Sequence, residues 1–181
     1  FKMDANITTR FTSQWASMAI IGTIIFLFLS RRYKSLTNTV MSYVGVGFLV
    51  GGFAAFTIAA FGQVRPLVTV GLIFLGIGLG IWNVGTTGLM MDMSPGGRAG
   101  TFLGFWTLVV TFARGGGVST AGILRDLGLN LTGSSPIAYG ICFLMGTIGL
   151  VVSMYMLRQA NIKAFKSEQV RLDSATVLVG A

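Results

Sequence analysis

The chain has 181 residues, of which 53% are hydrophobic and only 10% are charged, whereas soluble proteins carry about 25% charged residues. This composition excludes a water-soluble domain as the main body of the protein and predicts an all-α integral membrane protein. The net charge of +8 does not indicate a nucleic-acid partner, because the basic residues lie in short stretches between apolar segments.

Two residue types limit the chemistry that the chain can perform. Histidine is absent, and Cys142 is the single cysteine. Ser-His-Asp and Cys-His nucleophile systems, the common zinc sites and a disulfide framework are therefore excluded. We expect no enzyme activity and no metal cluster.

Five apolar segments, each long enough to cross a hydrocarbon core of ~30 Å as a helix, follow one another along the chain. They are residues 13–30, 38–61, 67–91, 99–124 and 137–157. The fourth ends at Arg125 and Asp126, and a loop rich in Gly, Ser and Asn leads to the fifth. The sequence therefore predicts a transmembrane bundle over residues 1–158, followed by a tail over residues 159–181.

Basic residues are unevenly divided between the two ends of this predicted bundle. One end carries eight (Arg31, Arg32, Lys34, Arg98, Arg158, Lys163, Lys166 and Arg171) and the other four (Lys2, Arg10, Arg65 and Arg125). Because basic loops stay in the cytoplasm, we expect a cytoplasmic C-terminus and an external N-terminus. An external start at Phe1 without a signal segment suggests that at least one helix precedes it.

The tail mixes apolar residues with Lys163, Lys166 and Arg171. This pattern fits a short helix lying on the cytoplasmic lipid surface, and it fits a solvated tail equally well.

Trp82 and Asn83 lie near the middle of the third segment. A side-chain amide at this depth needs a hydrogen-bond partner, which is either another helix or a ligand.

The turn after the third segment, MDMSPGGRAG at residues 91–100, contains a proline and several glycines that favour a tight reversal. Asp92 and Arg98 flank this turn. They are candidates for a conformational latch, paired with each other or with Arg31 and Arg32 of the first loop. A surface pair contributes ~1 kcal/mol or less, so its role would be to set a geometry.

Arg114 lies about fifteen residues into the fourth segment, roughly 22 Å along the predicted helix. An arginine at this depth costs at least ~2.5 kcal/mol, so we expect it to meet an acceptor away from lipid. The candidates are a backbone carbonyl, a residue outside this chain and an anionic ligand group. The alternative is that Arg114 only ties two helices together.

Gly115, Gly116 and Gly117 follow Arg114 and leave open space beside the helix, for a neighbouring helix or for a flat ligand. Three GxxxG pairs predict further packing seams: Gly47 with Gly51, Gly76 with Gly80, and Gly100 with Gly104. Trp106, with Phe102, Phe105 and Phe112, gives the fourth segment an aromatic face. Such a face suits a planar ligand and also suits ordinary helix packing.

Residues 91–128 resemble the PucC family, the bacteriochlorophyll delivery branch of the major facilitator superfamily. The matching elements are Met91-Asp92, Gly100 with Gly104 and Trp106, Ala113-Arg114-Gly115, and Arg125-Asp126. The resemblance implies a twelve-helix fold of which this chain supplies helices 8–12, with the N-terminal half missing.

The resemblance also implies a membrane factor that assembles light-harvesting or photosystem complexes and binds or delivers chlorophyll or bacteriochlorophyll. It implies partners among antenna, reaction-centre and photosystem subunits and a location in a thylakoid or intracytoplasmic membrane. Carotenoid and lipid are further candidate ligands. Arg114, the glycines after it, Trp106 and Phe102 would border the pigment groove, with Trp82 and Asn83 as further contacts. In a chain without histidine, the amide of Asn83 is also a candidate magnesium ligand.

Two other functions stay open at this stage. The first is a secondary transporter in which Arg114 binds an anionic solute. The second is a structural subunit of a larger membrane complex.

Overall fold

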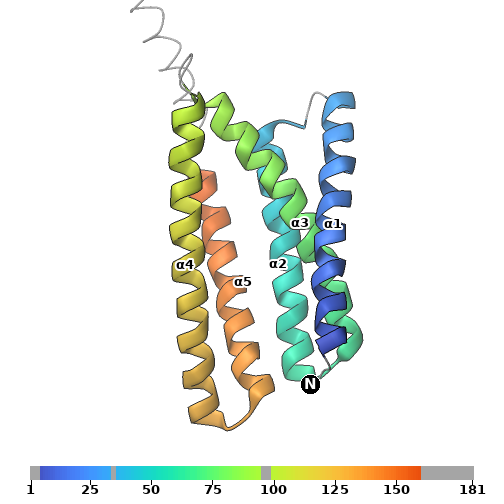
Figure 1. Ribbon diagram of the computed structural model, residues 1–181, viewed down its shortest axis with the longest axis vertical. Helices are drawn as coiled ribbons and strands as arrows, with labels where there is room; N and C mark the ends of the chain where they lie inside the picture. Colours follow the sequence, from blue (N-terminus) through green and yellow to red (C-terminus); the bar gives the residue numbers. More distant parts are fainter. Residues whose placement is uncertain (1–4, 34–35, 95–98, 160–181) are drawn as a thin grey trace, which may run out of the picture.

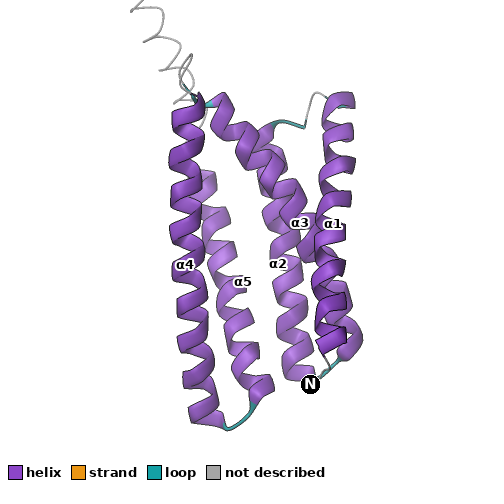
Figure 2. Cartoon of the chain, viewed as in Figure 1, coloured by secondary structure: helices purple, strands orange, loops and turns teal. Residues whose placement is uncertain are grey.

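The computed structural model describes residues 5–33, 36–94 and 99–159, which form five helices (Figure 1). The helices are α1 (Ala5–Arg32), α2 (Asn38–Gly62), α3 (Arg65–Asp92), α4 (Ala99–Thr132) and α5 (Ser135–Gln159). These described ranges contain no strand (Figure 2). All five helices contain an apolar stretch long enough to cross a membrane. The five-helix membrane fold predicted from the sequence is confirmed, and the predicted tail lies outside the described residues.

Helix ends follow local rules of capping. The hydroxyl oxygen of Thr37 accepts a hydrogen bond from the backbone N–H of Val40 and so caps the start of α2. α2 ends at Gly62, and the residue that follows, Gln63, turns the backbone into the left-handed region with a φ of 52°. Pro66 lies in the first turn of α3. Backbone N–H groups there have no partner within the helix, so the N–H that proline lacks costs no hydrogen bond. These caps keep the connection between α2 and α3 to two residues.

α4 is longer than the sequence predicted. We placed its end at Arg125 and Asp126, but the helix continues to Thr132. The two charged residues pair with each other on the helix surface, so their charges do not stop the helix, and the leucines that follow are good helix formers. The end comes at Gly133, whose φ is 63°.

α2 and α3 pack through glycines spaced seven residues apart. These are Gly45 and Gly52 on α2 and Gly71, Gly78 and Gly85 on α3. A Cβ atom placed on Gly78 would lie 2.9 Å from the backbone nitrogen of Leu49, so no larger residue fits there. The two backbones can therefore approach closely, as small residues allow in membrane bundles.

A second face of α3 packs against α1. A Cβ atom on Gly80 would collide with the carbonyl oxygen of Ala19, and one on Gly22 would lie 3.0 Å from the Cα of Ile77. The predicted seam at Gly76 and Gly80 is confirmed. Gly47, Gly100 and Gly104 have nothing within 4 Å among the described residues, so these GxxxG glycines form no seam between the five helices.

α5 joins α2 to α4. The ring of Phe143 in α5 lies 5.2 Å from that of Phe56 and 6.3 Å from that of Phe53, both in α2. On the other side of α5, a Cβ atom on Gly128 of α4 would lie 3.0 Å from the Cα of Ala138. The packing order is therefore α1, α3, α2, α5 and α4, and α3 also touches the first part of α4. In Figure 1, α3 is inclined across the bundle so that its end reaches the start of α4.

The last turns of α1 and α5 carry Arg31, Arg32 and Arg158. They lie at the same end of the bundle (Figure 1), as the predicted division of basic residues between the two ends requires. The assignment of this end to the cytoplasm stays a prediction.

Candidate functional site

Trp82 and Trp106 come together where α3 meets α4. Their ring centroids are 6.4 Å apart and the rings are tilted by 46°. Both side chains are half-buried. This tryptophan pair joins two residues that the sequence placed at one site, and it holds the first part of α4 against α3.

The aromatic residues of α4 divide between two faces. Phe102 is half-buried, four residues before Trp106 and on the same side of the helix. Phe105 and Phe112 are 70% and 74% exposed. They are seven residues apart, so they lie on one stripe of α4. The four aromatic residues therefore do not form the single face that was predicted. Phe102 and Trp106 form a half-buried pair, and Phe105 and Phe112 form an exposed pair.

Arg114 lies in a stretch of α4 that is exposed on all sides, and the ring of Phe112, two residues earlier, points to the other side of the helix. Its side chain is exposed, and it has no hydrogen bond or ion pair to any described residue. Nothing described lies within 4 Å of a Cβ placed on Gly115, Gly116 or Gly117. No helix of this chain fills the space that the glycines leave. We call the exposed stretch of α4 that contains Arg114 and Gly115–Gly117 the arginine face.

α4 is the most open helix of the bundle. None of the most apolar stretch of α4 is buried in the structure, whereas a third of the corresponding stretches in α2 and α3 is. A cation in the middle of such a stretch is costly in lipid without an acceptor. The described residues of this chain supply none, so an acceptor from another helix or from a ligand stays a prediction.

Asn83 does not join the arginine face. It lines a groove between α1 and α2 whose floor is α3, together with Thr23, Thr87 and Met41. The sequence therefore grouped residues that the structure separates: Trp82 faces α4, whereas the next residue faces the groove.

Asp92, a predicted latch residue, accepts a hydrogen bond from Asn38. The Nδ2 atom of Asn38 lies 3.1 Å from Oδ2 of Asp92 and joins the start of α2 to the end of α3. The side chain of Asn38 also lies over Gly88, because a Cβ there would be 2.7 Å from it. Asn38 is not among the residues that the sequence pattern indicates. Its position just after the helix-capping Thr37 was the available signal.

The other latch residues are less constrained. Arg31 and Arg32 are exposed, and within the described part of the chain neither pairs with Asp92. Arg98 lies outside the described residues. The latch involving these arginines stays a prediction.

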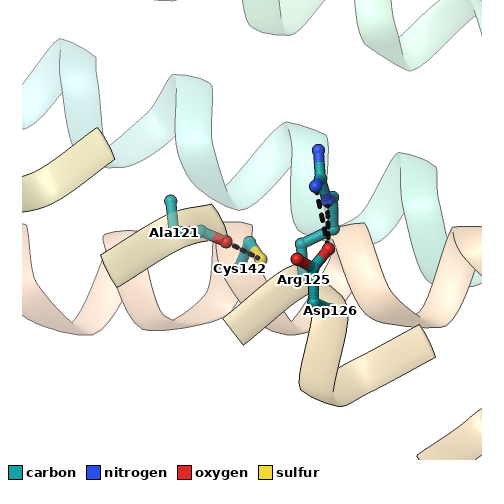
Figure 3. Close-up of polar contacts among 4 residues, drawn as sticks. All are labelled: Ala121, Arg125, Asp126 and Cys142. Carbon is teal, nitrogen blue, oxygen red and sulfur yellow. Dashed lines mark hydrogen bonds and ion pairs between the residues drawn. The ribbon is translucent and has the colours of Figure 1, made fainter. Parts of the chain in front are cut away.

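Near the other end of α4, one polar contact lies within the helix and one joins it to α5 (Figure 3). The Nε and Nη2 atoms of Arg125 both donate to Oδ1 of Asp126, at 2.9 and 2.8 Å. The Sγ atom of Cys142 in α5 donates to the carbonyl oxygen of Ala121 in α4, at 3.5 Å. Over the described ranges, no cluster of three or more His, Cys, Asp or Glu side chains could hold a metal ion.

Comparison with known proteins identifies a family. A family model described as PUCC protein matches residues 1–165. Protein PucC of Rhodovulum sulfidophilum is 30% identical over 126 residues, which cover 68% of this chain and 27% of that protein. Protein PucC of Cereibacter sphaeroides is 29% identical over 121 residues, which cover 66% and 26%. The match thus spans about a quarter of the length of these relatives.

No solved structure matches the chain. The family match runs through all five helices and so does not depend on one motif. This integral membrane chain belongs to the PucC family.

Proposed function

We propose that the protein takes part in assembling light-harvesting or photosystem complexes in a photosynthetic membrane, and that it binds chlorophyll or bacteriochlorophyll at the arginine face. Family membership supports the assembly role. The observation that carries the pigment site is Arg114, exposed on an apolar helix without an acceptor among the described residues.

The arginine face suits a flat molecule that carries carbonyl groups. The three glycines remove side chains over nearly one helical turn, so a planar ring can approach the backbone. The guanidinium of Arg114 offers five N–H donors to ketone or ester oxygens. A bound chlorophyll would supply absorption of visible light and the acceptor that Arg114 lacks.

The experiment replaces Arg114 in the complete protein and follows assembly of the pigment complex. We expect Arg114→Leu to reduce antenna absorbance in membranes at least fivefold, with unchanged abundance of the protein itself. Abundance should not fall, because removing the arginine also removes the cost of at least ~2.5 kcal/mol of holding it in the membrane.

Asn130→Leu is the matched control. Asn130 is an exposed polar residue on the same helix, more than four turns beyond Arg114. This variant should assemble the complex normally. Normal assembly by Arg114→Leu would show instead that Arg114 is structural.

A further inference from the structure

The groove between α1 and α2 is a second candidate site, separate from the arginine face. Its volume is about 510 Å³. It is open rather than enclosed, and its lining residues are Thr23, Leu27, Ser30, Asn38, Met41, Asn83, Val84, Thr87, Gly88 and Met91. Half of these side chains are apolar or glycine, and the rest are uncharged and polar.

Three of the polar side chains in the groove have unused hydrogen-bonding capacity. Most hydroxyls inside these helices donate to a carbonyl of their own helix one turn earlier, as Thr86 does to Trp82 at 2.7 Å. Thr23, Thr87 and the amide of Asn83 make no hydrogen bond to any described residue. In a bilayer, water is scarce, so such groups favour a polar partner from outside the chain.

These three groups form a ladder along the groove. The hydroxyl oxygen of Thr23 lies beside Gly80, 2.9 Å from where its Cβ would be. Asn83 and Thr87 follow on the same face of α3, so the ladder is about 10 Å long. Its Thr87 end lies one to two turns from Asp92, near the end of the bundle that carries Arg31.

Arg31 gives this end of the groove a positive charge. It follows Thr23 and Leu27 at intervals of four residues, so the three share one face of α1. Arg31 and Arg32 lie in the last turn of the helix, at the level where lipid head groups lie. The groove thus has a basic end, a ladder of uncharged polar groups and apolar walls.

We propose that this groove binds one anionic glycerophospholipid. Its phosphate lies beside Arg31, its two ester carbonyls accept hydrogen bonds from Thr87 and Asn83, and the side chains of Leu27 and Met41 flank the start of the acyl chains. Arg31 supplies a charge partner for the phosphate, and the polar ladder supplies hydrogen-bond donors for the ester carbonyls. An open groove with apolar walls favours entry from the bilayer over entry of a soluble phosphate.

The test uses the complete protein in nanodiscs of equal parts phosphatidylglycerol and phosphatidylcholine, followed by mild detergent extraction and native mass spectrometry. The wild-type protein should retain one phosphatidylglycerol. The double variant Asn83→Leu/Thr87→Val, which keeps the side-chain shapes, should retain at least tenfold less. Thr86→Val is the control, because its hydroxyl is already bonded within α3, and it should retain lipid like the wild type.

Two further variants keep the test decisive if the double variant fails to fold. Leu27→Trp fills the groove and leaves the polar ladder intact, so it should also lose the lipid. Arg31→Gln/Arg32→Gln should keep a lipid but lose the preference for phosphatidylglycerol. The proposal is overturned if the wild type retains no phospholipid, if it retains a pigment there instead, or if both the folded double variant and Leu27→Trp retain phosphatidylglycerol normally. Arg114 is unchanged in all of them, so these results are independent of the pigment site.

Discussion

Gly45 of α2 lies directly against the backbone of Trp82 in α3. A Cβ atom on Gly45 would be 2.6 Å from the backbone nitrogen of Trp82. Since the indole ring of Trp82 in turn meets that of Trp106, this contact links the α2–α3 seam to the start of α4. Close packing at a single glycine therefore positions one of the residues that the sequence assigned to the site.

Replacing Gly45 should destabilise the protein and separate the tryptophan pair. We expect Gly45→Val to lower stability by about 1–3 kcal/mol, because the added side chain forces α2 away from α3. Gly47→Val, two residues along the same helix, should have little effect, since nothing described lies within 4 Å of Gly47. Thermal unfolding in detergent compares the two variants. Equal melting temperatures would contradict the close α2–α3 approach.

Substitutions in the GxxxG pairs should likewise have an effect only where the glycine contacts another helix. Gly80→Leu meets the backbone of Ala19 and should weaken the contact between α1 and α3, whereas Gly104→Leu meets no described residue. Cysteine crosslinking between α1 and α3 measures the contact. We expect the crosslink yield to fall severalfold for Gly80→Leu only. A fall for both variants would mean that the motif, rather than the observed contact, determines packing.

Substitutions at the ends of α2 and α4 should change the stability of the protein in opposite directions. Gln63 pays the cost of a left-handed backbone at a φ of 52°, so Gln63→Gly should raise stability by about 1 kcal/mol. Gly133 occupies the same region at a φ of 63°, so Gly133→Ala should lower it by a similar amount. Chemical denaturation measures both changes. Shifts of the same sign would contradict the assigned ends of α2 and α4.

The bond between Asn38 and Asp92 should make a modest contribution. Asn38→Ala removes the donor to Asp92 and the contact over Gly88, with an expected loss of about 0.5–1.5 kcal/mol. The exposed Asn130 offers a control, because Asn130→Ala removes no hydrogen bond to a described residue. A loss of stability above about 3 kcal/mol would contradict this account, because one hydrogen bond and one side-chain contact do not contribute so much.

The five helices could be predicted because long apolar segments have few other stable structures in a membrane. The packing between them was harder to predict. GxxxG spacing found Gly76 and Gly80, but the α2–α3 seam uses glycines seven residues apart, such as Gly71 and Gly78. This repeat was visible in the sequence, yet no local rule says which glycines face a neighbour.

The candidate site was predictable only in part. The depth of Arg114 and the flanking glycines identified the arginine face, because an arginine in lipid is costly wherever it lies. The separation of Trp82 from Asn83 depends on which helices lie on either side of α3. That arrangement arises from contacts across the whole bundle, which the sequence does not show residue by residue.

The most direct test of the pigment-handling role is the absorption spectrum of the complete protein, purified in mild detergent from photosynthetic membranes. We predict that it carries chlorophyll-type pigment or carotenoid and co-purifies with antenna or photosystem subunits. A protein free of pigment, with no photosynthetic partner in the same purification, would contradict the account.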